Sequence, residues 1–228
     1  MNRGLFCACL CALLFMSELV AAADENILFV TGRHSNKAKL NLLKEYGKAH
    51  KLNIERRSQS AISDPAAEFK AFDLVIFEAA SLRESQEIYS QYAPLVKVSG
   101  SRFLAIKSWR ETSLRKGLTE TQGKRVHDYY DNGGKDNLER LMAYLSASVF
   151  NNTTEEIPGA IIFPEIGLYH PSSEALVFDS LDDYRVWQSK REDFKPNSKI
   201  VAGVLLQRAL IESVQTNVVD AAIERLET

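Results

Sequence analysis

Cysteine is scarce in this sequence, and its positions are informative. The three cysteines, Cys7, Cys9 and Cys11, all lie near the amino terminus. Beyond them the chain has no thiol that could form a disulfide, ligate a metal or attack a substrate. The remaining residues must therefore fold without covalent cross-links, and any chemistry must use oxygen and nitrogen groups.

An excess of one charge and the common catalytic signatures are also missing. Lysine and arginine number 28 against 30 acidic residues, a net charge of -2, which argues against a nucleic-acid-binding protein. The sequence has no GxGxxG, P-loop, GxSxG or HExxH motif. Its histidines, at 34, 50, 127 and 170, are too widely spaced for a metal-binding pair on one helix face. We therefore expect no catalytic residue and no metal site here, in a chain of globular composition.

The first 23 residues predict a secretory signal peptide. Arg3 is followed by an apolar run of 12 residues, 5–16, and then by the small residues Ala21–Ala23. The run is too short to anchor the protein in a bilayer. Cleavage after Ala23 predicts an exported, periplasmic protein without a membrane span, whose cysteines leave with the peptide.

Residues 24–198 predict an α/β domain. Short apolar runs alternate with amphipathic segments, which is typical of βαβ units and a parallel, Rossmann-like sheet. The third helix should end before Pro94, and the basic, polar stretch 109–134, closing on Asp131–Gly134, predicts an irregular surface loop and turn. The expected strands are 27–30, 52–56, 74–77, 103–106 and 161–163, and the expected helices are 35–51, 64–72, 82–92, 136–150 and about 182–191.

A second unit is expected to begin at residue 199. Lys195–Ser198 has the composition of a linker, 200–206 predicts an apolar strand, and 216–226 predicts an amphipathic helix. A single strand–helix pair cannot bury its own apolar surfaces. Residues 199–228 are therefore interpreted as the first βα unit of a second, truncated α/β domain.

One candidate ligand site follows the first expected strand. Arg33 and His34 lie between Gly32 and the helix start near Ser35, where open α/β sheets bind ligands and helix N-termini favour anions. They could contact a carboxylate. The simpler interpretation is a turn with an exposed basic residue and a capping serine.

The second candidate is the octapeptide Pro164–Pro171, with the sequence PEIGLYHP. Its prolines and glycine restrict the backbone, and it presents Glu165, Tyr169 and His170 within six residues. A carboxylate, a phenol and an imidazole could bind a ligand or transfer protons. On residue types alone, a rigid connector with a packed tyrosine and a backbone-bonded histidine is the simpler alternative.

This octapeptide resembles the "PEIGIYHP"-type segment of the CobN and magnesium-chelatase H-subunit family. In that family an acidic stretch, an aromatic-rich helix and an apolar strand follow, as 179–183, Tyr184 with Trp187, and 200–206 do here. The closing 218–223 is similar to the family's "VVDALI" helix. The specific resemblance covers about residues 157–226.

The resemblance implies a tetrapyrrole of the cobalamin or porphyrin type as ligand, with divalent cobalt or magnesium. It implies the N-terminal part of an exported CobN-type chelatase large subunit, non-catalytic alone, whose partner is the missing C-terminal chelatase region or an uptake system. An exported protein meets little ATP, so an ATP-driven partner is not expected. The competing hypotheses are a stand-alone periplasmic module binding a tetrapyrrole or anionic small ligand, and a decayed, inactive gene product.

Overall fold

A computed structural model describes residues 24–32, 35–79, 81–106, 114–194 and 203–227. Its centre is a five-stranded sheet in the order β2-β1-β3-β4-β5, in which all neighbours are parallel except β4 and β5. β1, β3 and most of β4 are buried, as expected for apolar runs covered on both faces. The α/β class is therefore confirmed. The strands are β1 Glu25–Thr31, β2 Leu52–Ser58, β3 Leu74–Glu78, β4 Arg102–Ile106 and β5 Arg115–Lys116.

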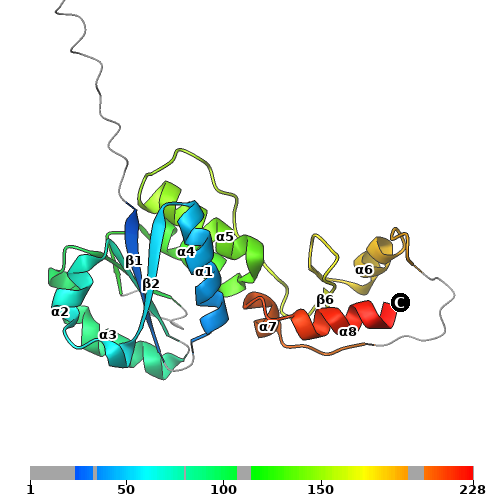
Figure 1. Cartoon of the computed structure of the whole chain (residues 1–228), viewed down its shortest axis with the longest axis horizontal. Coiled ribbons are helices and arrows are strands. Elements are labelled where there is room, and N and C mark those ends of the chain that lie inside the picture. The colour runs from blue at the N-terminus through cyan, green and yellow to red at the C-terminus, as the bar shows by residue number, and fades with distance from the viewer. Residues whose placement is uncertain (1–23, 33–34, 80, 107–113, 195–202, 228) are drawn as a thin grey trace, which may run out of the picture.

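Helices cover both faces of this sheet and create two cores. α1, α4 and α5 pack on one face, and the short α2 and the long α3 pack on the other (Figure 1). Side chains at Asn36, Asp64, Ser81 and Thr119 cap α1, α2, α3 and α4. The helices are α1 Lys37–Ala49, α2 Pro65–Glu68, α3 Leu82–Val98, α4 Glu120–Asn132 and α5 Gly134–Tyr144, which continues as a π-helical turn, Leu145–Val149.

Two sequence predictions in this part are wrong. α3 does not end before Pro94 but continues through it to Val98. Pro94 and Ser90, one turn earlier, are both exposed, so water can satisfy the carbonyl that loses its amide partner. The stretch expected to be irregular contains α4, whose buried face carries Val126, Tyr129 and Tyr130. A capping box between Thr119 and Gln122 starts this helix.

The turn expected at Asp131–Gly134 separates α4 from α5. Gly133 and Gly134 have φ angles of +58° and +74°, in the region that favours glycine. A Cβ atom on Gly133 would lie 2.1 Å from the Glu212 carbonyl oxygen, so this turn also accepts close contact from the C-terminal part of the chain.

That C-terminal part forms a small group of elements beside the sheet-bearing part. The antiparallel pair β6 and β7 lies with α6 and α8, and α7 lies next to the turn between α4 and α5 (Figure 1). Arg208 in α7 donates a 3.2 Å hydrogen bond to Asn132, and Asn36 donates a 3.4 Å bond to Gln215. The elements are β6 Leu168–Tyr169, β7 Val177–Phe178, α6 Leu181–Gln188, α7 Arg208–Glu212 and α8 Asn217–Glu227.

The predictions for this region have mixed outcomes. Helices α6 and α8 are confirmed, but 161–163 is an extended segment without strand pairing, and 203–206 is not a strand. The linker at 195–198 and residues 200–202 lie outside the described residues, as does the signal peptide. The domain boundary at 198/199 remains a prediction. In the part of the chain that the structure describes, no helix is both long and apolar enough to cross a membrane.

Candidate functional site

The octapeptide folds as the first half of a tight hairpin. β6 pairs with β7, and the His170 amide donates to the Leu176 carbonyl at 2.9 Å. Gly167 precedes β6 where a Cβ atom would lie 2.6 Å from Val177 Cγ1, so only glycine permits this approach. The hairpin places Tyr169 and His170 next to α8, about fifty residues later in the chain.

Tyr169 connects the hairpin to the first half of α8. Its hydroxyl donates a 2.7 Å hydrogen bond to Asp220 Oδ1, and the Thr216 hydroxyl donates to Asp220 Oδ2 at 2.9 Å. Burial raises the pKa of Tyr169 to about 12, because the phenolate would lose hydration; the carboxylate of Asp220 adds to this rise, and a hydrogen bond with Thr216 opposes it. The phenol is therefore held in its protonated, donating form.

His170 connects the hairpin to the other end of the same helix. Its Nδ1 accepts the Ser172 amide at 3.1 Å. Nε2 lies 3.0 Å from Glu227 Oε1 and 2.7 Å from Arg191 Nη1. The ring is 1% exposed and packs against Trp187, with ring centroids 4.6 Å apart. Both ring nitrogens are thus occupied by protein groups.

Arg191 closes the network around Glu227. Its guanidinium donates to Oε1 at 2.9 Å and to Oε2 at 2.7 Å, and it lies 5.2 Å above the Trp187 ring. Burial alone would raise the pKa of Glu227, but hydrogen bonds and charge from Arg191 and His170 outweigh it and lower that pKa. Hydrogen bonds to Asp193 and Glu227 raise the pKa of Arg191. We call Tyr169, His170, Arg191, Asp220 and Glu227 the α8 anchor.

The structure places the five site residues predicted from the sequence in different environments. Tyr169 and His170 come together as members of the α8 anchor. Glu165 is exposed and has no hydrogen bond or ion pair within the described structure. Arg33 and His34 lie outside the described residues. Sequence reasoning missed Arg191, Asp220 and Glu227 as site residues. Two signals were available: Asp220 lies in the segment similar to the "VVDALI" helix, and it shares a helix face with Glu227 seven residues later.

The contacts of the α8 anchor attach α8 to the β6–β7 hairpin. Tyr169, His170 and Arg191 all contact the carboxylates of Asp220 and Glu227, which belong to one helix. Within the ranges that the structure describes, no group of three or more histidine, aspartate or glutamate side chains could hold a metal ion. In this arrangement the phenol and the imidazole of the octapeptide both contact α8.

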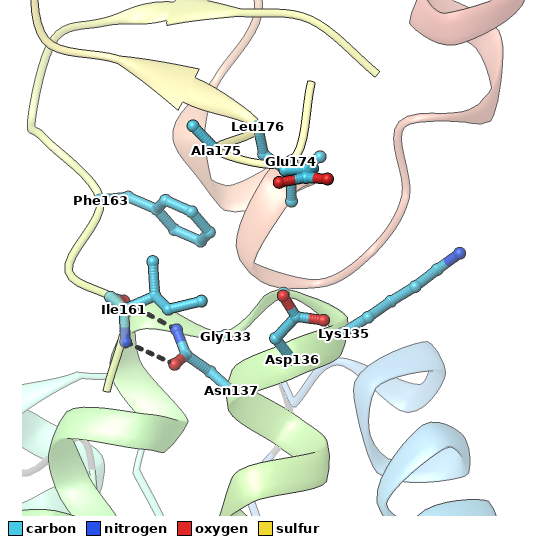
Figure 2. A pocket seen from close by; sticks show the side chains of 10 residues that line it. Gly133, Lys135, Asp136, Asn137, Ile161, Phe163, Glu174, Ala175 and Leu176 are labelled. Carbon is cyan, nitrogen blue, oxygen red and sulfur yellow. Dashed lines mark hydrogen bonds between the residues drawn. The ribbon is translucent and has the colours of Figure 1, made fainter. Parts of the chain in front are cut away.

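A small pocket lies where the hairpin approaches α5. Figure 2 shows Phe163 and Ile161 on one side, Leu176 and Glu174 above, and Asp136 at the start of α5. Its volume is about 90 Å³, which accommodates a few waters but not a tetrapyrrole. The Asn137 side chain donates to the Ile161 carbonyl and accepts its amide, both at 2.8 Å, and so fixes this wall.

Two of the comparisons with known proteins gave a match. No curated protein matches the chain. The catalytic subunit of cobaltochelatase from Mycobacterium tuberculosis is a structural neighbour, with a TM-score of 0.41 and 17% identity over 65% of this chain. The chain covers 12% of the length of that subunit. The family model for CobN/Magnesium Chelatase matches residues 127–228, from within α4 to the last residue given. Over this region, which is less than half of the chain, the sequence is similar to the CobN/magnesium chelatase family.

Proposed function

We propose that this chain is the N-terminal part of an exported CobN-type chelatase large subunit, which handles a tetrapyrrole and a divalent metal such as cobalt or magnesium. Within such a subunit, we assign this part a framework role and not the chemistry of metal insertion. The observation that carries the proposal is the α8 anchor, in which the octapeptide's phenol and imidazole are both committed to one helix.

A group that transfers protons to a substrate must reach it within hydrogen-bonding distance. His170 cannot do so in this arrangement, because Ser172 and Glu227 occupy its two nitrogens and the ring is buried. Tyr169 is kept protonated and aimed at Asp220. Both side chains therefore favour a structural contribution to the full-length type of subunit.

Metal insertion provides the direct test. The purified chain is mixed with a porphyrin or a corrin and with Co²⁺ or Mg²⁺, with and without ATP, and the visible spectrum is followed. We expect no insertion above the protein-free rate. Insertion that His170→Gln abolishes, in a variant that keeps its helical circular dichroism, would contradict the framework role.

The same spectra test the alternative hypothesis that the chain is a stand-alone module that binds a tetrapyrrole. A saturable shift of the tetrapyrrole spectrum without metal insertion would favour that module. No shift at about 100 µM ligand, a concentration that detects micromolar affinity, would count against it.

The proposed export depends on the leader sequence. Expression of the whole sequence in a bacterial host, followed by fractionation and mass spectrometry, should give a periplasmic protein that begins at Asp24. A cytosolic protein with an intact leader would contradict export, whatever the outcome of the spectral assays.

A further inference from the structure

A second region of the molecule, far from the octapeptide in sequence, has the form of a binding site. A hollow of about 620 Å³ opens beside the carboxyl ends of β1 and β2 and the first three turns of α3. Small-molecule sites span about 300–1,000 Å³, so its size suits a small ligand. Its walls come from three segments: Thr31 and Gly32, Ser58 to Ile62, and Ser81 to Gln91.

The hollow lies where an open parallel sheet places its ligands. β2 pairs with one side of β1, and β3 pairs with the other side. The order of the strands therefore reverses at β1, and the loops that leave the strands diverge there. Thr31 is in register with Ser58 of β2 and with Glu78 of β3, so the three strands end level. Thr31 and Glu78 are both buried, which places polar groups beneath the edge of the sheet.

The walls are rich in neutral hydrogen-bonding groups. Of the eleven described residues that line the hollow, six carry a hydroxyl or a side-chain amide, and none is lysine, histidine or aromatic. The amides of Gln59 and Gln91 meet at 2.7 Å and join the wall from β2 to that from α3. Arg83 is paired with Glu87 at 2.9 Å along the exposed face of α3.

The start of α3 is unsuited to an anion. The Ser81 hydroxyl accepts the Glu84 amide at 3.2 Å, and the Ser81 carbonyl accepts the Ser85 amide at 3.0 Å. The Glu84 carboxylate stands over Gly32, within 2.8 Å of where a Cβ atom would be. A carboxylate therefore lines the hollow next to the end of β1, which disfavours a phosphate there.

We propose that this hollow binds a small uncharged polyhydroxy compound, of the size of a mono- or disaccharide. Hydroxyl and amide groups can donate and accept in turn, as a polyol requires, whereas a tetrapyrrole would need flat apolar surfaces. The site is independent of the proposed chelatase framework role, because it lies outside residues 127–228.

An amide chemical-shift titration of the purified protein tests this site with three probes: trehalose, inorganic phosphate and putrescine. We expect trehalose to shift the signals of Ser58, Ser60 and Ser81 saturably, with a dissociation constant at least about tenfold below those of phosphate and putrescine. The absence of a saturable shift at about 50 mM trehalose, or tighter binding of either ion, would overturn the proposal.

A filling variant and a matched control link the binding to the hollow. Ser60→Trp places a bulky side chain at an exposed position of the wall and should weaken trehalose binding by about tenfold or more. Ser189→Trp adds the same group at an exposed serine that follows α6 and does not line the hollow, and should leave binding within about twofold. If Ser60→Trp unfolds the protein, Gln59→Ala removes the bridge to Gln91 instead. Equal effects of the wall and control variants would place trehalose elsewhere and refute the assignment.

Discussion

Replacing Arg191 with methionine should release α8 without unfolding the sheet. Methionine keeps most of the aliphatic volume against Trp187 but removes the guanidinium that grips Glu227. Glu227 would keep its contact with His170. The last turns of α8 should then open more often, while β1 to β4 retain their own cores.

The expected size of the effect follows from the geometry. A hydrogen bond to a charged group contributes about 1.5–3 kcal/mol, and Arg191 makes two to Glu227. The Glu227 side chain is 29% exposed, so water recovers part of the loss. The pair with Asp193 is at the surface and adds about 0–1 kcal/mol. We therefore expect about 2 kcal/mol, or a roughly 30-fold rise in the opening equilibrium.

This difference should shrink in acid. Because the pKa of Glu227 is lowered in the folded protein, the stabilisation is full above the unfolded pKa of about 4.3. It is lost as the pH falls through the lower, folded pKa. The wild type should therefore approach the Arg191→Met variant below about pH 4.

Hydrogen exchange of individual amides measures the opening of α8 directly. Protection of the α8 amides should fall in Arg191→Met, whereas Arg185→Met, an exposed arginine in α6, should change nothing. Unchanged α8 protection in Arg191→Met, or an equal loss of protection in β1 to β4, would refute the claim that the α8 anchor stabilises α8 locally.

Three further substitutions probe other contacts. Tyr169→Phe should lower the free energy of unfolding by about 1 kcal/mol. The raised pKa of Tyr169 stabilises the folded protein below about pH 10, and this stabilisation is lost as the pH rises toward about 12. An absorbance titration of the variant should show one fewer tyrosine ionising near pH 12. Gly133→Ala should displace α7 and lower the melting temperature, whereas Gly100→Ala, with nothing within 4 Å, should not; equal melting temperatures would contradict the close contact. Asn137→Ala should cost about 2–3 kcal/mol in denaturant unfolding, because it leaves both backbone groups of residue 161 unpaired, and a change below about 0.5 kcal/mol would be inconsistent with the clamp.

The sheet was largely predictable because its strands are short apolar runs with polar boundaries. Residues 27–30 and 74–77 lie within β1 and β3, and the alternation with helices indicated the parallel order. α4 was missed because its buried face has only a few apolar residues among many charges. The strand expected at 161–163 failed because its partners are side chains of α4 and α5, which a local pattern cannot reveal.

Only part of the candidate site was predictable from the sequence. The octapeptide identified Tyr169 and His170 by residue type and by resemblance. Their partners Asp220 and Glu227 lie 51 and 57 residues later, and no local periodicity specifies which phenol meets which carboxylate. The hollow at the sheet edge was indicated only by topology, since its serines and glutamines have no signature spacing.

The segment from Ile157 to Phe163 has buried side chains at its two ends, and between them it is bound through its main chain. Arg125, Tyr129 and Arg140 bind the carbonyls of residues 157, 158 and 159, and the amides of 161 and 163 donate to Asn137 and Asn132. The side chain of Asn137 therefore acts as a single rung of a β-ladder supplied by a helix. Such a grip does not distinguish one side chain from another, so evolution can rewrite exposed positions such as Ile162 while the path of the polypeptide stays the same.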